Sequence, residues 1–194
     1  MRCFIAIDFP EVIKEKIAEI QTLLSKAGAD VTWVNPAHIH LTLYFFKELP
    51  VGKVELLYEK IKKEIQEQEA FELTLHGIGS FPPSPDDPRV IWIGIQGSLK
   101  LAGLYQKIQG VSQPFDEKRP KGERNGSFTP HATVGRVRSR KNLRPVKNLI
   151  EKFSSEPVGI CPVDELIFFE SRLSQKGPDY FKLHRIPLKH QHHI

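Results

Sequence analysis

The stretch from His38 to Phe46, His-Ile-His-Leu-Thr-Leu-Tyr-Phe-Phe, is the part of the chain on which the fold is built. Its alternating apolar residues predict a β-strand. The pattern His-x-Thr-apolar returns in the stretch Thr-Pro-His-Ala-Thr-Val-Gly-Arg, from Thr129 to Arg136. Strand side chains two positions apart share a face, so each motif sets one imidazole beside one hydroxyl. We predict two strands facing a common cleft, carrying the pairs His40 with Thr42 and His131 with Thr133.

Composition and length are those of a globular protein. The 194 residues are 40% hydrophobic and 26% charged, enough for one large domain or two small lobes. No apolar run approaches the roughly 20 residues that span a bilayer, and the start of the chain reads as a first strand and not as a signal peptide. The two cysteines, Cys3 and Cys161, form no CxxC pair. We therefore expect a cytoplasmic protein with no disulfide framework, no zinc ribbon and no membrane partner.

Positive charge is concentrated in one segment. The net charge is +5, and residues 118–147 hold ten Lys or Arg but a single acid. Such a segment indicates a polyanionic partner, and nucleic acid is the polyanion that we favour. A solvated surface is the simpler alternative. Because the segment brackets His131, we favour an anionic substrate.

Periodicity predicts an α+β fold with mainly antiparallel sheets. The two His-x-Thr motifs are 91 positions apart, one in each half, which suggests two pseudo-equivalent lobes with the cleft between them. The expected strands are 2–7, 31–34, 39–45, 71–78, 90–95, 131–137, 164–170 and 180–186, the expected helices 11–24, 54–65, 99–108 and 146–153, and the expected long loops 81–88 and 112–128.

Two imidazoles and two hydroxyls in one cleft suit phosphodiester cleavage. Imidazole has an unperturbed pKa of about 6.5, so one histidine can be neutral and the other protonated near pH 7. The reaction needs a base to deprotonate the nucleophile and an acid to protonate the leaving oxygen. Threonine hydroxyls can donate hydrogen bonds to the non-bridging phosphate oxygens. The residues by themselves do not say which histidine is the acid.

The motifs resemble those of the two-histidine (2H) phosphoesterases. The opening of the chain (Arg-Cys-Phe-Ile-Ala-Ile-Asp-Phe-Pro), the run Trp33-Val-Asn-Pro-x-x-Ile-His-Leu-Thr-Leu and the stretch Phe128-Thr-Pro-His-Ala-Thr-Val-Gly-Arg are similar to the RNA 2′,3′-cyclic phosphodiesterase branch, also called 2′-5′ RNA ligases. The chain departs from that pattern at Tyr44-Phe-Phe-Lys-Glu, where many members have Lys-Phe-Leu-Gly-Glu. Because this glycine is missing, the resemblance does not predict the conformation of the turn after this strand or a substrate contact there.

The resemblance implies a fold, a reaction and roles for four residues. Residues 1–194 would form a single domain of two lobes that exchange strands, with the active-site cleft between them. The reaction would be metal-free hydrolysis of a terminal 2′,3′-cyclic phosphate of RNA to a 2′-phosphate, without any cofactor. His40 would be the proton donor to the leaving 3′-oxygen, His131 the proton acceptor that activates water, and Thr42 and Thr133 the phosphate-binding residues.

The expected partner is an RNA that ends in a 2′,3′-cyclic phosphate, tRNA fragments included, and the expected oligomeric state is a monomer. Two alternative activities would use the same site, namely 2′-5′ RNA ligation and hydrolysis of a small cyclic nucleotide. A different class of function is a non-catalytic RNA-binding module. The intact pair of motifs argues against that class, because binding alone needs no matched acid and base.

Other residues are candidates for RNA contacts. Phe45, or its neighbour Tyr44, could stack on a base, and Lys121 and Arg124 in the long loop could contact the RNA backbone. Arg136 is a candidate for the phosphate or the RNA backbone, but it follows His131 by five positions and is expected on the opposite strand face unless the strand bends. The candidates for RNA contacts are therefore Phe45, Lys121, Arg124 and Arg136.

The His-x-His pair formed by His38 and His40 could bind zinc, yet no third ligand completes a familiar pattern, so we expect no metal.

Overall fold

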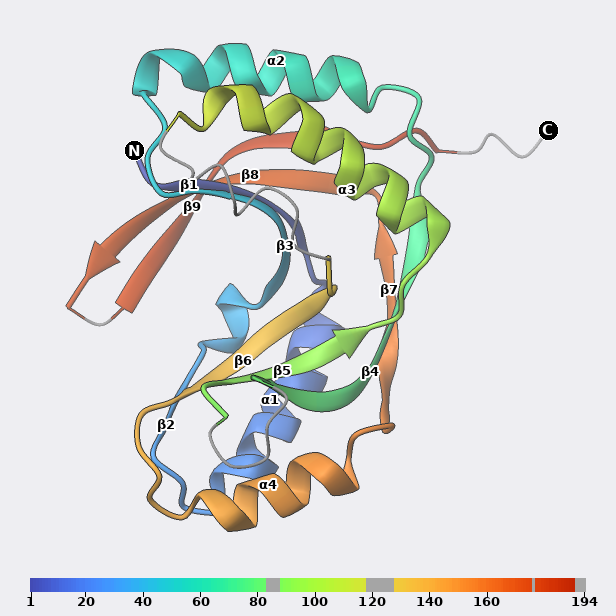
Figure 1. Cartoon of the computed structure of the whole chain (residues 1–194). Helices are drawn as coiled ribbons and strands as arrows, with labels where there is room; N and C mark the ends of the chain where they lie inside the picture. The colour runs from blue at the N-terminus through green and yellow to red at the C-terminus, as the bar shows by residue number, and fades with distance from the viewer. Residues whose placement is uncertain (83–87, 118–127, 176, 191–194) are drawn as a thin grey trace.

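Two antiparallel sheets form the centre of the molecule (Figure 1). The computed structural model describes residues 1–82, 88–117, 128–175 and 177–190. The predicted α+β class with antiparallel sheets is confirmed. The four-stranded sheet has the order β3 (His40–Phe46), β1 (Cys3–Asp8), β8 (Glu165–Ser174), β9 (Gly177–Pro187); the five-stranded sheet has the order β2 (Val31–Trp33), β6 (His131–Val137), β5 (Val90–Ile95), β4 (Phe71–Phe81), β7 (Pro157–Val163).

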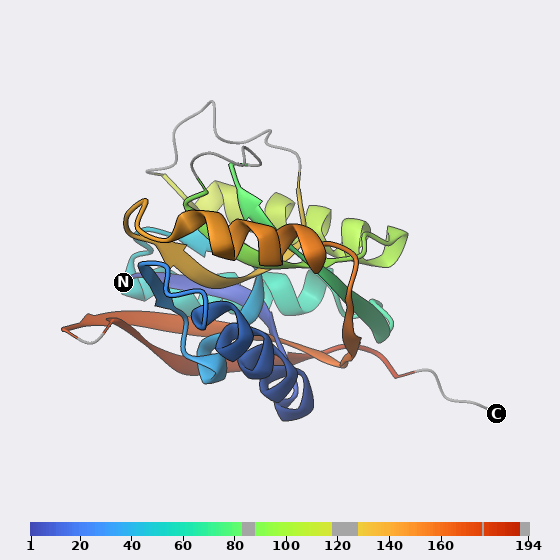
Figure 2. The same cartoon turned by 90° about the horizontal axis from the view of Figure 1, so that it is seen from below.

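Each sheet is covered by its own pair of helices. In Figure 1, α2 and α3 lie over the four-stranded sheet, whereas α1 and α4 lie at the opposite end, beside the five-stranded sheet; Figure 2 shows α1 and α4 from below. None of the helices in the described residues is both long enough and apolar enough to cross a membrane. The helices are α1 (Glu11–Ser25), α2 (Val54–Glu64), α3 (Leu99–Ser112) and α4 (Leu143–Lys152), with 3₁₀ turns at Pro36–His38, Val51–Lys53 and Gln113–Phe115.

Each sheet takes strands from both halves of the chain. β2, from the first half, lies at the edge of the five-stranded sheet, and β8 and β9, from the end of the chain, complete the four-stranded sheet. The two His-x-Thr strands belong to different sheets, because β3 is an edge strand of one and β6 is an inner strand of the other. β3 and β6 nevertheless contact each other, so the two motifs face each other across the boundary between the sheets.

β1 is buried on both faces because its residues alternate between two apolar clusters. Ile5 and Ile7 belong to the main core, together with residues of both sheets and all four helices. Phe4 and Ala6 point the other way, into a small cluster with Ile167 of β8. Phe4 of this second cluster also lines the cavity between the two motif strands.

Several elements differ from the prediction. β7 was missed because Pro157, Gly159 and Pro162 are typical of loops; proline is tolerated there because β7 is an edge strand. α4 begins at Leu143 and not at Val146, since proline fits the first turn of a helix. The strands of the β8–β9 hairpin are longer than predicted, with Ser174 paired to Gly177.

The turn after β3 forms with Lys47 at the place where the pattern described above has a glycine. Among the described residues, only Asn142 and three glycines elsewhere in the chain have a positive φ, so Lys47 and Glu48 need no left-handed backbone. The turn is instead held by the start of the chain. The amino group of Met1 donates to the Leu49 carbonyl at 2.6 Å, and the Leu49 amide donates back to the Met1 carbonyl at 2.7 Å.

One carboxylate links α1 to the four-stranded sheet, and its loss is expected to destabilise the fold. Asp8 accepts hydrogen bonds from Lys14 of α1 at 2.6 Å and from Lys182 of β9 at 2.7 Å. Burial acts to raise the pKa of Asp8, but the two lysine hydrogen bonds outweigh it and the pKa lies below its usual value. Lys14 is 7% exposed, so Asp8→Ala would leave a buried charge unpaired. We expect a loss of about 3 kcal/mol in the free energy of unfolding, measured by denaturant titration.

The matched control is the exposed ion pair of Lys189 and Glu67, in which Lys189 Nζ lies 2.6 Å from Glu67 Oε2. Glu67→Ala is expected to change the free energy of unfolding by less than about 0.5 kcal/mol, because solvent already screens that pair. Equal losses for the two variants would contradict the structural role of Asp8.

Candidate active site

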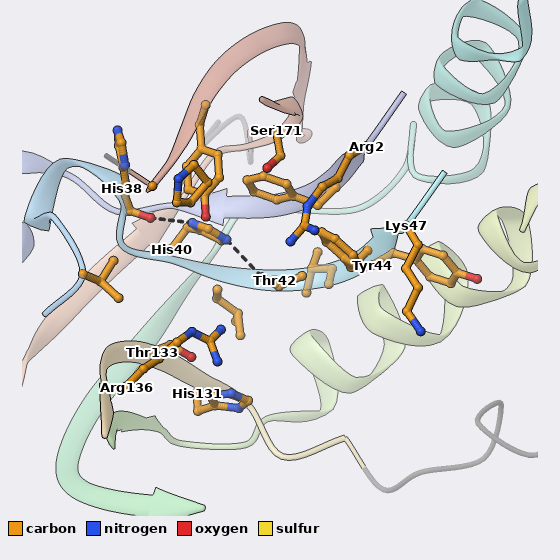
Figure 3. A pocket seen from close by; sticks show the side chains of 18 of the residues that line it. Arg2, His38, His40, Thr42, Tyr44, Lys47, His131, Thr133, Arg136 and Ser171 are labelled. Atoms are coloured by element: carbon orange, nitrogen blue, oxygen red, sulfur yellow. Dashed lines mark hydrogen bonds between the residues drawn. The ribbon is translucent and has the colours of Figure 1, made fainter. Parts of the chain in front are cut away.

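β3 and β6 present matching rows of side chains to one cleft (Figure 3). Each row has a histidine, a threonine two positions later and a third side chain five positions after the histidine. The rows are His40, Thr42 and Phe45 on β3, and His131, Thr133 and Arg136 on β6. All six side chains line a cavity of about 1250 Å³. The sequence therefore identified both motifs that meet in the cleft.

A β-bulge in each strand explains why the third side chain also reaches the cleft. Along β3, Tyr44 pairs with Ile5 and Thr42 pairs with Ala6, so Leu43 is the extra residue. Along β6, Gly135 pairs with Ile91 and Thr133 with Trp92, so Val134 is the extra residue. An extra residue reverses the alternation of faces beyond it.

The orientation expected of Arg136 in a regular strand is therefore wrong, because β6 bends at the bulge. Simple alternation sends a side chain five positions after His131 to the opposite face, but the bulge at Val134 returns it to the cleft. The same reversal at Leu43 brings Phe45 into the cleft, as the base-stacking hypothesis requires.

Both histidine rings are oriented by a backbone carbonyl two residues before them. The Nδ1 atom of His40 is 2.7 Å from the His38 carbonyl oxygen, and Nδ1 of His131 is 2.7 Å from the Thr129 carbonyl oxygen. A carbonyl oxygen only accepts, so each Nδ1 carries its proton and donates it. In the neutral ring Nε2 then has the lone pair, and that of His40 accepts the Thr42 hydroxyl at 3.0 Å. Proton transfer can proceed at Nε2 while Nδ1 stays anchored.

Aromatic side chains pack against both imidazoles. His40 stacks on Phe4, with ring centroids 4.6 Å apart, and the edge of Tyr180 meets it at 5.5 Å. Phe81 meets His131 edge-on at 5.0 Å, and Trp92 lies at 6.4 Å. Burial among the aromatic rings lowers the pKa of His40 to about 4, although the bond to the His38 carbonyl and the charge of Asp8 act to raise it. In the free protein His40 is therefore neutral at pH 7.

The cleft carries more positive than negative side chains. Arg136, Arg138, Arg2 and Lys47 line it, and the sequence reading had identified only the first of them. Arg138 lies two positions after Arg136, just past the end of β6, and simple alternation from His131 would have sent it to the opposite face together with Arg136. Arg2 and Lys47 reach the cleft from segments that only the pairing of β1 with β3 brings together, and the Arg2 guanidinium lies 4.7 Å from the ring centre of Phe45. The predicted contacts Lys121 and Arg124 lie outside the described residues.

No group of three His, Cys, Asp or Glu side chains suited to a metal ion occurs within the described residues. His38 lines the cleft, but its ring packs against Tyr180 with centroids 4.9 Å apart. The neighbouring His40 uses Nδ1 for the His38 carbonyl and Nε2 for Thr42. The imidazole and hydroxyl groups of the cleft can donate and accept hydrogen bonds, and the imidazoles can also transfer protons.

Residues 9–174 match the family model described as the 2′-5′ RNA ligase superfamily. Among curated proteins, the chain is 31% identical to an RNA 2′,3′-cyclic phosphodiesterase of Methanothermobacter thermautotrophicus, over 93% of this chain and 95% of that protein. It is 34% identical to a protein of the same name from Archaeoglobus fulgidus, over 93% of this chain and 96% of that protein.

Solved structures agree with the sequence relatives. A crystal structure of TT0787 of Thermus thermophilus superposes with a TM-score of 0.79 at 26% identity, covering 99% of this chain and 100% of the other. Escherichia coli LigT complexed with 3′-AMP superposes with a TM-score of 0.75 at 25% identity, covering 96% of this chain and 97% of the other. The similarity extends over both sheets and therefore over both sides of the cleft.

Proposed function

Because this chain belongs to the 2′-5′ RNA ligase superfamily, we propose that it hydrolyses the terminal 2′,3′-cyclic phosphodiester of RNA to a 2′-phosphomonoester. The enzyme class is that of the RNA 2′,3′-cyclic phosphodiesterases. One observation carries the proposal. Two imidazoles from different sheets line one cleft, and each has Nδ1 fixed to a carbonyl, which leaves Nε2 for proton transfer.

In the proposed reaction the two histidines divide the proton transfers. Nε2 of His131 takes a proton from water as its oxygen bonds to phosphorus. The bond from phosphorus to the 3′-oxygen breaks, and Nε2 of His40 gives a proton to that oxygen. The hydroxyls of Thr42 and Thr133 donate hydrogen bonds to the non-bridging oxygens, where negative charge accumulates. Product release and proton exchange with solvent restore both rings, so no cofactor or metal enters the scheme.

The setting that we propose follows from the same features. Both halves of the site come from one chain, which fits a monomer acting on RNA ends such as those of tRNA fragments. Cys3 and Cys161 are free and buried, and burial raises the pKa of each thiol to about 12. Inert thiols of this kind fit the reducing cytoplasm. Residues 1–194 are taken as a single domain, since neither sheet alone holds both histidines.

The test is incubation of an oligoribonucleotide ending in 2′,3′-cyclic phosphate with the protein in excess EDTA. A 2′-phosphate product formed at an undiminished rate supports the proposal. A 3′-phosphate product would keep the histidine pair but reverse the orientation of the cyclic phosphate. Loss of activity in EDTA would indicate a metal-dependent hydrolase. Joining to an added 5′-hydroxyl RNA would favour the ligase alternative, and binding without turnover the RNA-binding module.

A proton donor must carry its proton, so the proposal makes a prediction about pH. Free His40 has a pKa of about 4, and a bound phosphate anion stabilises the charged imidazolium and raises that pKa. At any pH between the pKa of His40 in the free protein and its higher pKa in the complex, binding is then accompanied by uptake of a proton. The affinity for a cyclic nucleotide, whose phosphodiester keeps a single charge, is expected to increase as pH falls from neutrality towards 4, by up to about tenfold per pH unit, and to level off below that.

The measurement is calorimetric titration of a 2′,3′-cyclic nucleotide into the His131→Ala variant, in which turnover is slow. A variant that also carries His40→Ala is the control, and its affinity is expected to stay flat over the same range. Binding that weakens as pH falls would contradict the assignment of His40 as the donor.

A further inference from the structure

Two glutamine side chains, one from each lobe, hold the two β-bulges of the active site. Gln21 of α1 donates from Nε2 to the carbonyl oxygens of Val34 at 2.7 Å and Val134 at 2.8 Å. Gln109 of α3 donates from Nε2 to the carbonyl oxygen of Leu43 at 2.9 Å. Val134 and Leu43 are the extra residues of the bulges in β6 and β3. The same side-chain group therefore meets the same backbone feature on both sides of the cleft.

The hydrogen bonds of Gln21 lie in a buried environment, where their loss would be costly. Gln21 is 6% exposed, so its amide lies among buried groups where a lost hydrogen bond is not replaced by water. The Val134 carbonyl also accepts the Val34 amide at 2.9 Å. Gln21 thus joins Val34, the residue after β2, to β6 at the bulge itself. A bulge interrupts the regular ladder of strand pairs, and a side-chain donor from a helix stabilises that interruption.

We propose that Gln21 and Gln109 are positioning residues, which fix the two bulges and thereby aim Arg136 and Phe45 into the cleft. The inference builds on the proposed function, since its readout is the binding and turnover of an RNA end. Without the extra residue, regular pairing would turn the side chains beyond it to the opposite face. The bulge held by Gln21 directs the side chain of Arg136, a cation that lies in the same cleft as both imidazoles.

The position of the bulge predicts which kinetic constant changes. His131 and Thr133 come before Val134 and pair regularly with Gly94 and Trp92 of β5. Loss of the Gln21 bonds should therefore leave the histidine in place while Arg136 becomes misdirected. We expect KM for the RNA substrate to rise with kcat largely kept, because Arg136 serves binding and the imidazole serves the chemical step. General loss of folded protein would lower the active concentration and leave KM unchanged.

The experiment is a double-mutant cycle between Gln21→Met and Arg136→Ala. Gln21→Met keeps the length of the side chain but has no N–H donor. It is expected to raise KM by about tenfold, since small displacements of positioning groups are costly. In the Arg136→Ala background it is expected to have little further effect, because the side chain that the bulge directs is gone. Gln68→Met, at a glutamine that bonds to Lys107 away from the cleft, is the matched control and should leave KM unchanged.

The same cycle between Gln109→Met and Phe45→Ala tests the other bulge. Effects that multiply in either cycle, or an unchanged KM in Gln21→Met, would overturn the inference. Should Gln21→Met fold poorly, Gln21→Glu supplies a second variant, whose carboxyl donates a hydrogen bond only when protonated. Its KM relative to the wild type at the same pH is expected to recover as pH falls, and a constant ratio would also count against the proposal.

Binding of the 2′-phosphate product is measured for every variant alongside turnover. A wild-type protein without turnover would refute the proposed function. The coupling between Gln21 and Arg136 would still be decided by the binding constants, so the two failures are distinguishable.

Discussion

Replacement of His131 by alanine is expected to lower kcat for an RNA 2′,3′-cyclic phosphate by about 10²- to 10⁴-fold, the contribution of a positioned general base. The ring has Nδ1 anchored on the Thr129 carbonyl at 2.7 Å and lines the cleft with Thr133. Alanine removes the proton acceptor but leaves the backbone of β6 unchanged. The measurement is single-turnover hydrolysis, which isolates the chemical step from product release.

His38→Ala is the matched control, because His38 also lines the cleft. His38 orients the His40 ring through its backbone carbonyl oxygen, which lies 2.7 Å from Nδ1 of His40. The substitution keeps this carbonyl. We expect a rate within a few-fold of the wild type, because neither of the two proposed proton transfers uses the His38 ring. A His131→Ala variant with comparable activity would contradict the role of His131.

Replacement of His40 by alanine is expected to cause a loss of similar size, about 10²- to 10⁴-fold, that depends on the leaving group. The 3′-oxygen of ribose is a poor leaving group and needs a proton as its bond to phosphorus breaks. A 4-nitrophenolate leaves without one. His40→Ala should therefore be strongly impaired on the RNA cyclic phosphate but much less so on a 3′-deoxynucleoside 2′-(4-nitrophenyl phosphate).

The same pair of substrates separates acid from base. His131→Ala should be impaired on both, since attack by water needs a base whatever group departs. If His131→Ala is the variant that recovers on the nitrophenyl ester, the roles are exchanged. That outcome would agree with the low pKa of free His40, about 4, and would contradict proton uptake by His40 on phosphate binding.

The core of the site could be predicted from sequence because it is local. His40 with Thr42 and His131 with Thr133 lie two positions apart on strands, so simple alternation places each pair on one face. The α+β class was predicted correctly for a similar reason, since most helices and strands have clear periodicity. Here the sequence pattern and the three-dimensional arrangement carry the same information.

The missed features depend on contacts between distant segments. The bulges at Leu43 and Val134 have no sequence signal comparable to a turn, and the partners that hold them, Gln21 and Gln109, come from separate helices. The orientation predicted for Arg136 from regular strand alternation was wrong for this reason. β7 was missed because two prolines and a glycine conceal an edge strand that exists only beside β4.

The central claim is that His40 and His131 act as one acid–base pair, and the most direct test is their double-mutant cycle in excess EDTA. Wild type, His40→Ala, His131→Ala and the double variant are compared in single-turnover hydrolysis of an oligoribonucleotide ending in 2′,3′-cyclic phosphate. We expect each single variant to lose about 10²-fold or more, and the double variant to be little slower than the slower single one, because residues that act as a unit are not additive. Losses that multiply, or a single variant that keeps nearly wild-type activity, would contradict the account.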